Sequence, residues 1–368
     1  MSSRPTTWSD HLPVDFVLPD DAEAHEPAEA RGIARDDVRM LVTTPAGVRH
    51  ARVRDLAELL APGDLLVVNT SATLPAALDA RRIGRHQADG RTVPLHVGDE
   101  LEDGRWVVEL RHPDASGPAR DGRPGERLGV GGGLVLTLGS AYPDETEPEA
   151  RLWTAVPSRP VSRVAHLHAH GRPVRYGYVE QPWPLEQLQT VFGRHPGSAE
   201  MPSAGRPFTE RLVVDLVSAG VSIAPIVLHC GLSSPEAHEP PGSEPFAVPG
   251  STAALVNHAR ARGGRVIAVG TTVTRALETA ADPDGIVGPV AGRTDLVLGP
   301  GRPARVVDGL LTGLHAPQAS HLLLLEAVAG TALVRTAYRE SLEHGYLWHE
   351  FGDTTLFLPA SDPSVSAA

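Results

Sequence analysis

The chain has 368 residues, 41% hydrophobic and 21% charged, a composition typical of a folded protein of two to three domains. All 33 basic residues are arginine, which excludes chemistry that needs a lysine amine: a Schiff base, a pyridoxal-phosphate linkage or a Walker-type phosphate loop. The single cysteine, Cys230, excludes a disulfide framework within the chain and any multi-cysteine metal site, and the net charge of −12 argues against generic nucleic-acid binding.

No apolar run approaches the ~20 residues that a membrane-spanning helix needs. The first ten residues are polar, and no apolar signal segment follows them. We therefore expect a soluble, cytoplasmic protein without membrane contact. Small and polar residues predict flexible tails at residues 1–12 and 359–368.

Between the tails, hydrophobic periodicity changes twice. The segment 13–75 predicts a strand at 38–43, a helix at 53–60, a turn at 61–64 and a buried strand at 65–68. The segment 76–174 predicts short strands without a helix, at 95–97, 106–110, 134–138 and 152–156, separated by loops at 111–125 and 139–150.

The segment 175–358 alternates helices with strands. Helices are predicted at 210–219, 251–262, 273–280, 320–329 and 331–343, and strands at 221–229, 266–269, 296–298, 304–307 and 354–358. The predicted fold class is α/β: a layered domain with a mostly parallel sheet, built from residues 13–75 and 175–358, carrying an inserted all-β barrel at 76–174.

The most informative local pattern is the buried strand 266–269, followed by Gly270, Thr271, Thr272 and a helix that carries Arg275 and Glu278. Ligands of α/β sheets collect at the carboxyl ends of strands against helix N-termini, so this turn suits a carboxylate or a ribose. The alternative is an ordinary turn with threonine caps, in which Arg275 and Glu278 form a surface pair.

Four further patterns have structural alternatives. On a strand, His166, His168 and His170 would share one face and could bind a metal, although an exposed histidine-rich strand or connection is favoured. Cys230 ends an apolar strand and is interpreted as a small core residue rather than a nucleophile. His315 precedes a helix and is a candidate acid, base or ligand donor, or a capping residue. Asp353 follows Gly352 and is interpreted first as a turn residue.

Read together, these segments resemble the S-adenosylmethionine:tRNA ribosyltransferase-isomerase family of queuosine biosynthesis. The resemblance spans residues 15–358 in the order expected. It rests on motifs at residues 15–19 (DFVLP), 27–31 (PAEAR), 62–69 (PGDLLVVN), 189–192 (QTVF), 202–205 (PSAG), 208–209 (FT), 228–231 (LHCG), 269–278 (VGTTVTRALE), 294–296, 300–301, 312–317 and 352–353.

The resemblance implies an α/β domain with an inserted barrel and a reaction without a metal or prosthetic group. S-adenosylmethionine is the implied co-substrate, whose ribosyl part moves onto a 7-aminomethyl-7-deazaguanine base of tRNA and rearranges to an epoxycyclopentane, releasing adenine and methionine. Because the sulfonium already activates the neighbouring carbon, the protein has to orient the partners, exclude water and move protons.

The sequence departs from the family pattern at five places. N-D-T-R becomes NTSA at 69–72, T-A-G-L-H-F-T becomes SAGRPFT at 203–209, G-x-G-T-F becomes GLSSP at 231–235, M-H-x-E becomes PGSE at 241–244, and T-N-F-H-L-P becomes TGLHAP at 312–317. Loss of a catalytic acid or base costs about 10²–10⁴-fold in rate, so the departures indicate a diverged member with an altered acceptor side or altered proton transfer.

The expected site follows from the resemblance. Gly270, Thr271, Thr272 and Arg275 are expected to bind the donor. Ser203, Ala204, Gly205, Phe208, Thr209, Gln189, Thr190 and Thr312 are expected to line the substrate pocket. His229 and His315 are the acid/base candidates, with Glu278 and Asp353 behind them, and no metal ligand is assigned.

Three functions remain open from the sequence. The first is the family reaction on tRNA, or the same donor chemistry on a small nucleoside-like acceptor. The second is a non-catalytic protein on this scaffold that binds S-adenosylmethionine or a partner. The third is a metal-dependent hydrolase that uses His166, His168 and His170.

Overall fold

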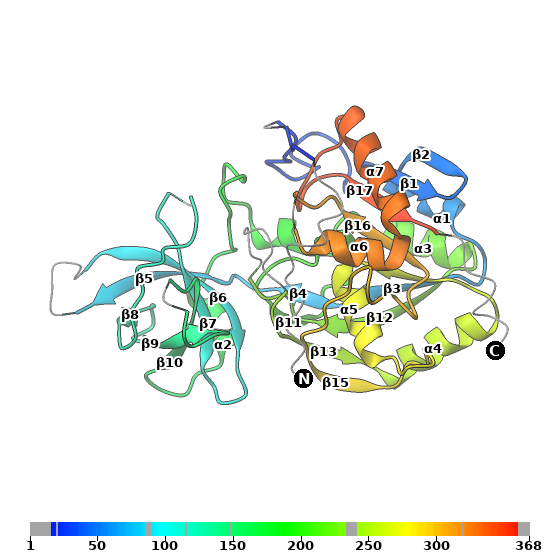
Figure 1. The fold of residues 1–368 in the computed structure, drawn as a ribbon. Coiled ribbons are helices and arrows are strands. Elements are labelled where there is room, and N and C mark those ends of the chain that lie inside the picture. Colours follow the sequence, from blue (N-terminus) through cyan, green and yellow to red (C-terminus); the bar gives the residue numbers. More distant parts are fainter. Residues whose placement is uncertain are drawn as a thin grey trace.

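The structure, a computed structural model, describes residues 16–19, 21–84, 90–114, 116–147, 149–232, 241–317 and 319–359. Residues 1–12, Asp15, residues 233–235 and residues 360–368, which the sequence analysis discusses, lie outside the described residues. An α/β part and a β-barrel lie side by side, with the short strands β4 (Ser71–Thr73) and β11 (His195–Ser198) between them (Figure 1).

The α/β part is built on a nine-stranded sheet in the order β15-β13-β12-β3-β14-β16-β17-β1-β2. The centre, β12-β3-β14-β16, is parallel, as is the pair β17-β1, and the remaining neighbours pair antiparallel. The strands are β1 (Arg39–Thr44), β2 (Gly47–Arg52), β3 (Leu65–Asn69), β12 (Ser222–Leu228), β13 (Glu244–Val248), β14 (Val266–Val269), β15 (Val290–Thr294), β16 (Gly309–Gly313) and β17 (Thr354–Phe357).

Helices cover both faces of this sheet, so its central strands are buried on both sides (Figure 1). Along β3, Leu65 and Val67 pack into one core while Leu66 and Val68 pack into the other, as the alternation of a strand requires. The first core contains residues of α4 (Gly250–Ala261), α5 (Thr271–Ala280), α6 (His321–Ala329) and α7 (Thr331–Glu343). The second contains residues of α1 (Leu56–Leu59), α3 (Glu210–Ser218) and the 3-10 helix η5 (Ser203–Gly205).

The prediction of strands at 296–298 and 304–307 is wrong, because both segments are loops. Their apolar side chains, such as Leu296 and Val306, are buried in the first core, so burial rather than strand pairing explains their composition. In the second loop the backbone N–H groups of 305–307 donate to Glu278 instead of to a neighbouring strand. The helix predicted at 53–60 is the 3-10 helix η3 (Val53–Asp55) followed by α1.

The inserted module is a closed antiparallel barrel in the order β10-β7-β6-β5-β8-β9. Its interior is apolar and includes Trp106, Leu128 and Leu136. The strands are β5 (Ala77–Ile83), β6 (Thr92–Glu100), β7 (Trp106–Leu110), β8 (Arg127–Gly129), β9 (Val135–Tyr142) and β10 (Leu152–Pro157). The layered α/β fold with an inserted barrel is therefore confirmed.

The expectation that this module has no helix is wrong, because α2 (Arg163–His170) follows the barrel. The side chain of Ser162 caps this helix by accepting a hydrogen bond from the N–H of Ala165. His166 is buried and lies 3.0 Å from the Val130 carbonyl through Nε2, whereas His168 and His170 are exposed. His166 and His170 lie one helical turn apart with ring centroids 4.7 Å from each other, whereas His168 points in nearly the opposite direction. The three histidines therefore do not share one face, and the metal hypothesis, which assumed a strand, has no geometric support.

His96 on β6 makes the stability of the barrel sensitive to acid. It is 3% exposed, and burial, together with the charges of Arg111 and Arg172, lowers its pKa to about 3. Above the unfolded-state pKa of ~6.5, His96 is neutral in both states and does not make the free energy of unfolding depend on pH. As the pH falls towards the folded-state pKa, only the unfolded chain binds a proton at this residue, so the free energy of unfolding decreases with a slope approaching about 1.4 kcal/mol per pH unit.

Urea unfolding from pH 7 to pH 4.5 measures this contribution as a difference between the parent and the variant His96→Phe. The variant keeps a ring against Tyr176, which contacts His96 edge-on at 5.9 Å. We expect the free energy of unfolding to fall more steeply for the parent below pH 6.5. Equal slopes for the two proteins would show that His96 titrates normally.

Candidate active site

Four strand ends meet at one edge of the sheet, because β12, β3, β14 and β16 are parallel. Asn69 ends β3 and ties it to the end of β12: its Nδ2 donates to the Leu228 carbonyl at 2.8 Å, and its Oδ1 accepts from the Leu228 N–H at 3.0 Å. The same amide lies 3.4 Å from the hydroxyl of Thr272, which follows β14. Residues at the ends of β3, β12 and β14 are therefore in contact with one another at the predicted site.

The turn after β14 requires glycine. Gly270 has φ +99°, and a Cβ there would lie 3.2 Å from the Cβ of Ala204. This contact places η5, and with it the predicted pocket residues Ser203, Ala204 and Gly205, directly against the turn. Helix α5 starts here without a side-chain cap, so Thr271 and Thr272 are not capping residues. The N-terminus of α5 therefore keeps the polarity that suits a carboxylate or a ribose.

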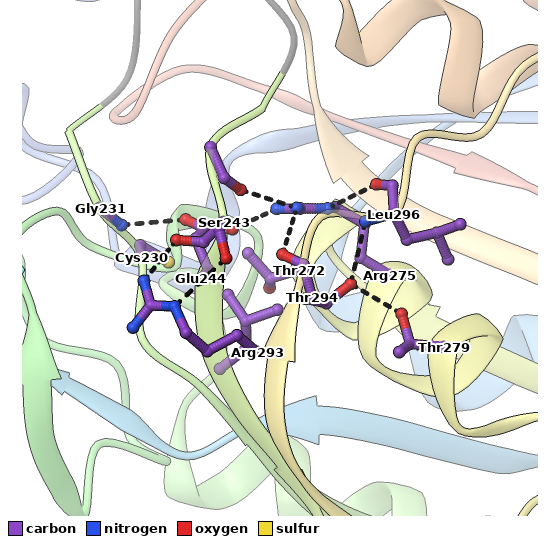
Figure 2. Close-up of polar contacts among 12 residues, drawn as sticks. Cys230, Gly231, Ser243, Glu244, Thr272, Arg275, Thr279, Arg293, Thr294 and Leu296 are labelled. Atoms are coloured by element: carbon purple, nitrogen blue, oxygen red, sulfur yellow. Dashed lines mark hydrogen bonds and ion pairs between the residues drawn. The ribbon is translucent and has the colours of Figure 1, made fainter. Parts of the chain in front are cut away.

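Arg275 lies on α5, between the segment of Glu244 and that of Thr294 and Leu296 (Figure 2). It is 4% exposed, and its Nε donates to the Leu296 carbonyl at 3.0 Å. Its Nη2 donates to the carbonyls of Gly242 at 2.9 Å and Thr294 at 3.0 Å, and its Nη1 donates to Glu244 Oε2. The guanidinium is therefore a cross-link that holds three segments around the site.

Glu244 is the charge partner of Arg275. Its second oxygen, Oε1, accepts from the N–H of Gly231 at 2.9 Å (Figure 2). Burial raises the pKa of Glu244, and the charge of Arg275 and these hydrogen bonds oppose that rise. The motif residue retained at 244 thus ties the end of β12 to α5 through Arg275.

Glu278 does not form the surface pair with Arg275 that was considered as an alternative. Both side chains are buried, and the two Glu278 oxygens accept the N–H groups of residues 305, 306 and 307 at 2.9, 2.9 and 3.0 Å. Its hydrogen bonds hold the loop before β16 against α5. The position of Glu278 is therefore explained by a structural role.

We expect Glu278→Gln to lower the free energy of unfolding by about 1–3 kcal/mol, because an amide cannot accept all three N–H groups. Affinity for S-adenosylmethionine, the co-substrate that the resemblance implies, should change less than threefold, since the Glu278 side chain contacts the loop before β16 and not the strand ends. Thermal or urea unfolding and calorimetric titration measure the two effects. The exposed Glu58→Gln on α1 is the control. A large loss of affinity at unchanged stability would contradict the structural role.

His229 follows β12 and is held by the β4–β11 ribbon. Its Nδ1 lies 2.7 Å from Ser71 Oγ, which in turn lies 2.6 Å from Ser198 Oγ. A Cβ on Gly197 would lie 2.3 Å from the His229 ring, so only glycine permits this packing. Burial, reinforced by the charge of Arg163, lowers the pKa of His229, so the imidazole is neutral at pH 7.

Cys230 follows His229 and packs against the first core. Burial raises the pKa of its thiol, and the nearby Glu244 charge raises it further. The group is therefore a thiol and not a thiolate at pH 7, which agrees with its interpretation as a small core residue.

His315 lies in the loop after β16. Its Nε2 is 3.1 Å from the hydroxyl of Thr312, its backbone N–H donates to Tyr338 Oη at 3.0 Å, and its carbonyl accepts from Trp348 Nε1 at 3.1 Å. Burial lowers the pKa of His315 well below its usual value, helped by His321. The second acid/base candidate is thus also a neutral imidazole with a fixed position.

Asp353 lies at the same edge, because β17 runs antiparallel to β16. One oxygen accepts from the Arg39 backbone N–H at 2.9 Å, and the other accepts from Arg39 Nε at 3.0 Å and from the Leu347 N–H at 2.9 Å. These bonds fix the start of β17 against β1. They leave Asp353 a structural carboxylate rather than a turn residue alone.

The remaining predicted pocket residues lie on the η5 and α3 side. Gln189 exchanges two hydrogen bonds with the Thr73 backbone, Phe208 is fully buried against Phe192, and Thr209 caps α3. They contribute to a groove of about 510 Å³, lined by Arg35, Glu186, Gln189, Thr190, Val191, Phe208, Thr209, Glu210 and Arg211. Thr190 packs against η5, because a Cβ on Gly205 would lie 3.4 Å from its methyl group.

The sequence analysis missed a polar aromatic cluster between the barrel and the strand ends. Tyr176 donates to Glu200, its ring stacks on that of Tyr178 at 6.2 Å, and Tyr178 stacks on His349 at 4.5 Å. His349 has φ +68°, a strained value for a residue with a side chain. Burial and the charge of Glu200 raise the pKa of Glu350 to about 8. These residues are far apart along the chain, so no local spacing indicates the cluster.

Two departures from the family pattern have a structural explanation. Thr70 donates its hydroxyl to the Ile226 carbonyl at 2.8 Å and so pairs β3 with β12. Arg206, where the family pattern has leucine, donates to Glu29 at 2.8 Å and to the Gln187 carbonyl at 2.9 Å, and its guanidinium lies over the ring of Phe351. These residues stabilise the walls of the site.

The fold is a two-part α/β protein with an inserted barrel, and the strand ends at the carboxyl edge of its sheet are a candidate small-molecule site. The family model described as "Queuosine biosynthesis protein" matches residues 13–357, and the chain belongs to this family. Within the described residues, no helix has the length and apolar character to cross a membrane.

Relatives match along nearly the whole chain. A Thermus thermophilus protein named S-adenosylmethionine:tRNA ribosyltransferase-isomerase is 37% identical over 363 residues, covering 94% of this chain and 98% of its own. The protein of that name from Acidiphilium cryptum is 36% identical, covering 93% and 97%. The crystal structure of the S-adenosylmethionine tRNA ribosyltransferase of Thermotoga maritima has a TM-score of 0.50 at 30% identity, covering 94% of this chain and 99% of that chain. The family resemblance drawn from the motifs is confirmed.

Proposed function

We propose that this chain transfers the ribosyl part of S-adenosylmethionine to a 7-aminomethyl-7-deazaguanine base of tRNA and isomerises it, releasing adenine and methionine. The observation that carries the proposal is the turn at Gly270 and the cross-link of Arg275. Both lie at the strand ends, and relatives of this chain are named S-adenosylmethionine:tRNA ribosyltransferase-isomerase. The co-substrate is S-adenosylmethionine, and a reaction on tRNA would take place in the cytoplasm.

The donor is assigned to the start of α5. Its carboxylate or ribose hydroxyls would meet backbone N–H groups and the hydroxyls of Thr271 and Thr272, with η5 closing the other side. Arg275 acts here as a positioning residue, since its hydrogen bonds go to Gly242, Glu244, Thr294 and Leu296. The pairing with Glu244 also offsets its charge, which favours a ligand that carries a sulfonium.

Proton transfer is assigned to His229 and His315, whose lowered pKa values keep them neutral and able to accept a proton at pH 7. Asp353 and Glu278 support the site through backbone contacts. The barrel of residues 76–174 is assigned as a domain inserted between residues 13–75 and 175–358, and the cluster at Tyr176 and Tyr178 is assigned to the acceptor side because Tyr176 contacts His96 of the barrel.

Release of adenine and methionine from S-adenosylmethionine tests the proposal. The assay is run without acceptor, with tRNA carrying the 7-aminomethyl-7-deazaguanine base, and with the free nucleoside of that base. We expect release that requires the tRNA. Release that requires only the nucleoside would assign the same donor chemistry to a small acceptor. Binding without release under every condition would indicate a non-catalytic S-adenosylmethionine-binding protein.

A further inference from the structure

His321 begins α6 and lies beside the predicted acid/base candidate His315. The two rings are stacked with their centroids 4.6 Å apart and their planes 4° apart. His321 therefore belongs to the edge where β14 and β16 end, although no motif of the sequence analysis includes it.

The ring nitrogens of the three imidazoles at this edge differ in their partners. His229 uses Nδ1 for Ser71, and His315 uses Nε2 for Thr312. Among the residues that the structure describes, neither ring nitrogen of His321 has a hydrogen-bond partner. The side chain is half-buried, so its nitrogens are not sealed in the core. The stacked ring of His321 therefore has a hydrogen-bond donor and an acceptor available to a ligand.

Burial, together with a nearby positive charge, keeps the His321 ring neutral at pH 7. Burial lowers its pKa to about 4, and the charge of Arg275 contributes to the shift. His315 faces it from the loop after β16 and Arg275 from α5, and His315 is itself neutral. A neutral imidazole keeps one N–H donor and one lone pair at pH 7, and it does not repel a positively charged sulfonium.

We propose that His321 contacts S-adenosylmethionine in the strand-end site, through the ring nitrogens that the stack on His315 leaves free. The assignment rests on the proposed function, because it takes the donor to be S-adenosylmethionine. It adds a substrate-binding residue that stands outside the motif at 312–317.

The variant His321→Phe tests this directly, because it keeps a flat ring on His315 and removes both nitrogens. We expect the S-adenosylmethionine Kd, measured by calorimetry, to rise about tenfold, the effect of losing one ligand hydrogen bond. Adenine release at S-adenosylmethionine concentrations below the Kd should fall by the same factor of about ten. The thermal midpoint should stay near that of the parent. Either His321→Asn or His321→Gln, which restore a donor and an acceptor at one ring position, should recover most of the affinity. His258→Phe on α4, which replaces an exposed histidine, is the matched control and should change nothing.

Parental affinity and parental release in His321→Phe would overturn the assignment. If His321→Phe unfolds, His321→Leu at parental stability decides in its place, since a tenfold loss of affinity supports the contact and parental affinity overturns it. If the parent chain binds S-adenosylmethionine but does not release adenine, only the proposed function is overturned. The affinity measurement on His321→Phe then still tests the contact. A parent that does not bind S-adenosylmethionine overturns both.

Discussion

Replacing Arg275 with alanine is expected to reduce adenine release at least 100-fold and to weaken S-adenosylmethionine binding about tenfold. The change removes hydrogen bonds to three backbone carbonyls and leaves the partly buried Glu244 without its cation. Breaking a buried ion pair from one side costs about 3–5 kcal/mol, so the free energy of unfolding should fall as well. Release assays, calorimetry and urea unfolding measure the three effects.

Two matched variants separate position from charge at this pair. Arg275→Lys keeps the charge but cannot reach four acceptors with one ammonium, so its turnover should stay low while its stability recovers in part. The double variant Arg275→Met with Glu244→Gln removes both charges and should be more stable than Arg275→Ala. If Arg275→Ala keeps parental affinity and turnover while the fold is intact, the donor site is assigned to the wrong place.

The second large effect is expected in the barrel, where Glu109 is fully buried. Its carboxylate pairs with Arg111 at 2.6 Å and with Arg151 at 2.5 Å, and both guanidinium groups are also buried. Glu109→Ala removes the anion that two buried cations share, so we expect a loss of about 3–5 kcal/mol of unfolding free energy. Urea unfolding followed by tryptophan fluorescence reports this loss, because Trp106 and Trp153 lie in the barrel core.

Glu102→Ala, at an exposed site of the same module, is the control for this prediction. Glu109→Gln should be intermediate, since the amide oxygen still accepts one hydrogen bond. A Glu109→Ala protein as stable as the parent would show that the guanidinium groups reach other partners or water once the carboxylate is gone.

The elements with a strong periodic signal were predictable from the sequence. Strands β3 and β14 are continuous apolar runs buried on both faces, and helices α4 to α7 follow their apolar faces to within a few residues. The wrong strand predictions fall where buried loop residues have the apolar composition of a strand. Leu296 and Leu298 are core residues on a loop, and the histidines of α2 alternate along a helix whose cap at Ser162 was overlooked.

The site was predictable only as far as local motifs reach. Gly270 and Arg275 were chosen from one strand–turn–helix pattern and lie at the strand ends, but the partners of Arg275 come from positions 242, 244, 294 and 296. The family pattern has histidines at 207 and 242, where this chain has proline and glycine. His321 lies in no family motif and joins His315 from the start of α6. Contacts between distant segments are set by the tertiary fold, and no spacing in the sequence encodes them.

The central claim is that the ribosyl group of S-adenosylmethionine ends on the acceptor base. Incubation of the chain with tRNA carrying the 7-aminomethyl-7-deazaguanine base and S-adenosylmethionine labelled with ¹³C throughout its ribose tests this most directly. Mass spectrometry of the digested tRNA should show one modified nucleoside that carries all the labelled ribosyl carbons, formed together with free adenine. Unlabelled tRNA alongside intact S-adenosylmethionine, after exposure to a protein that binds the donor, would contradict the account.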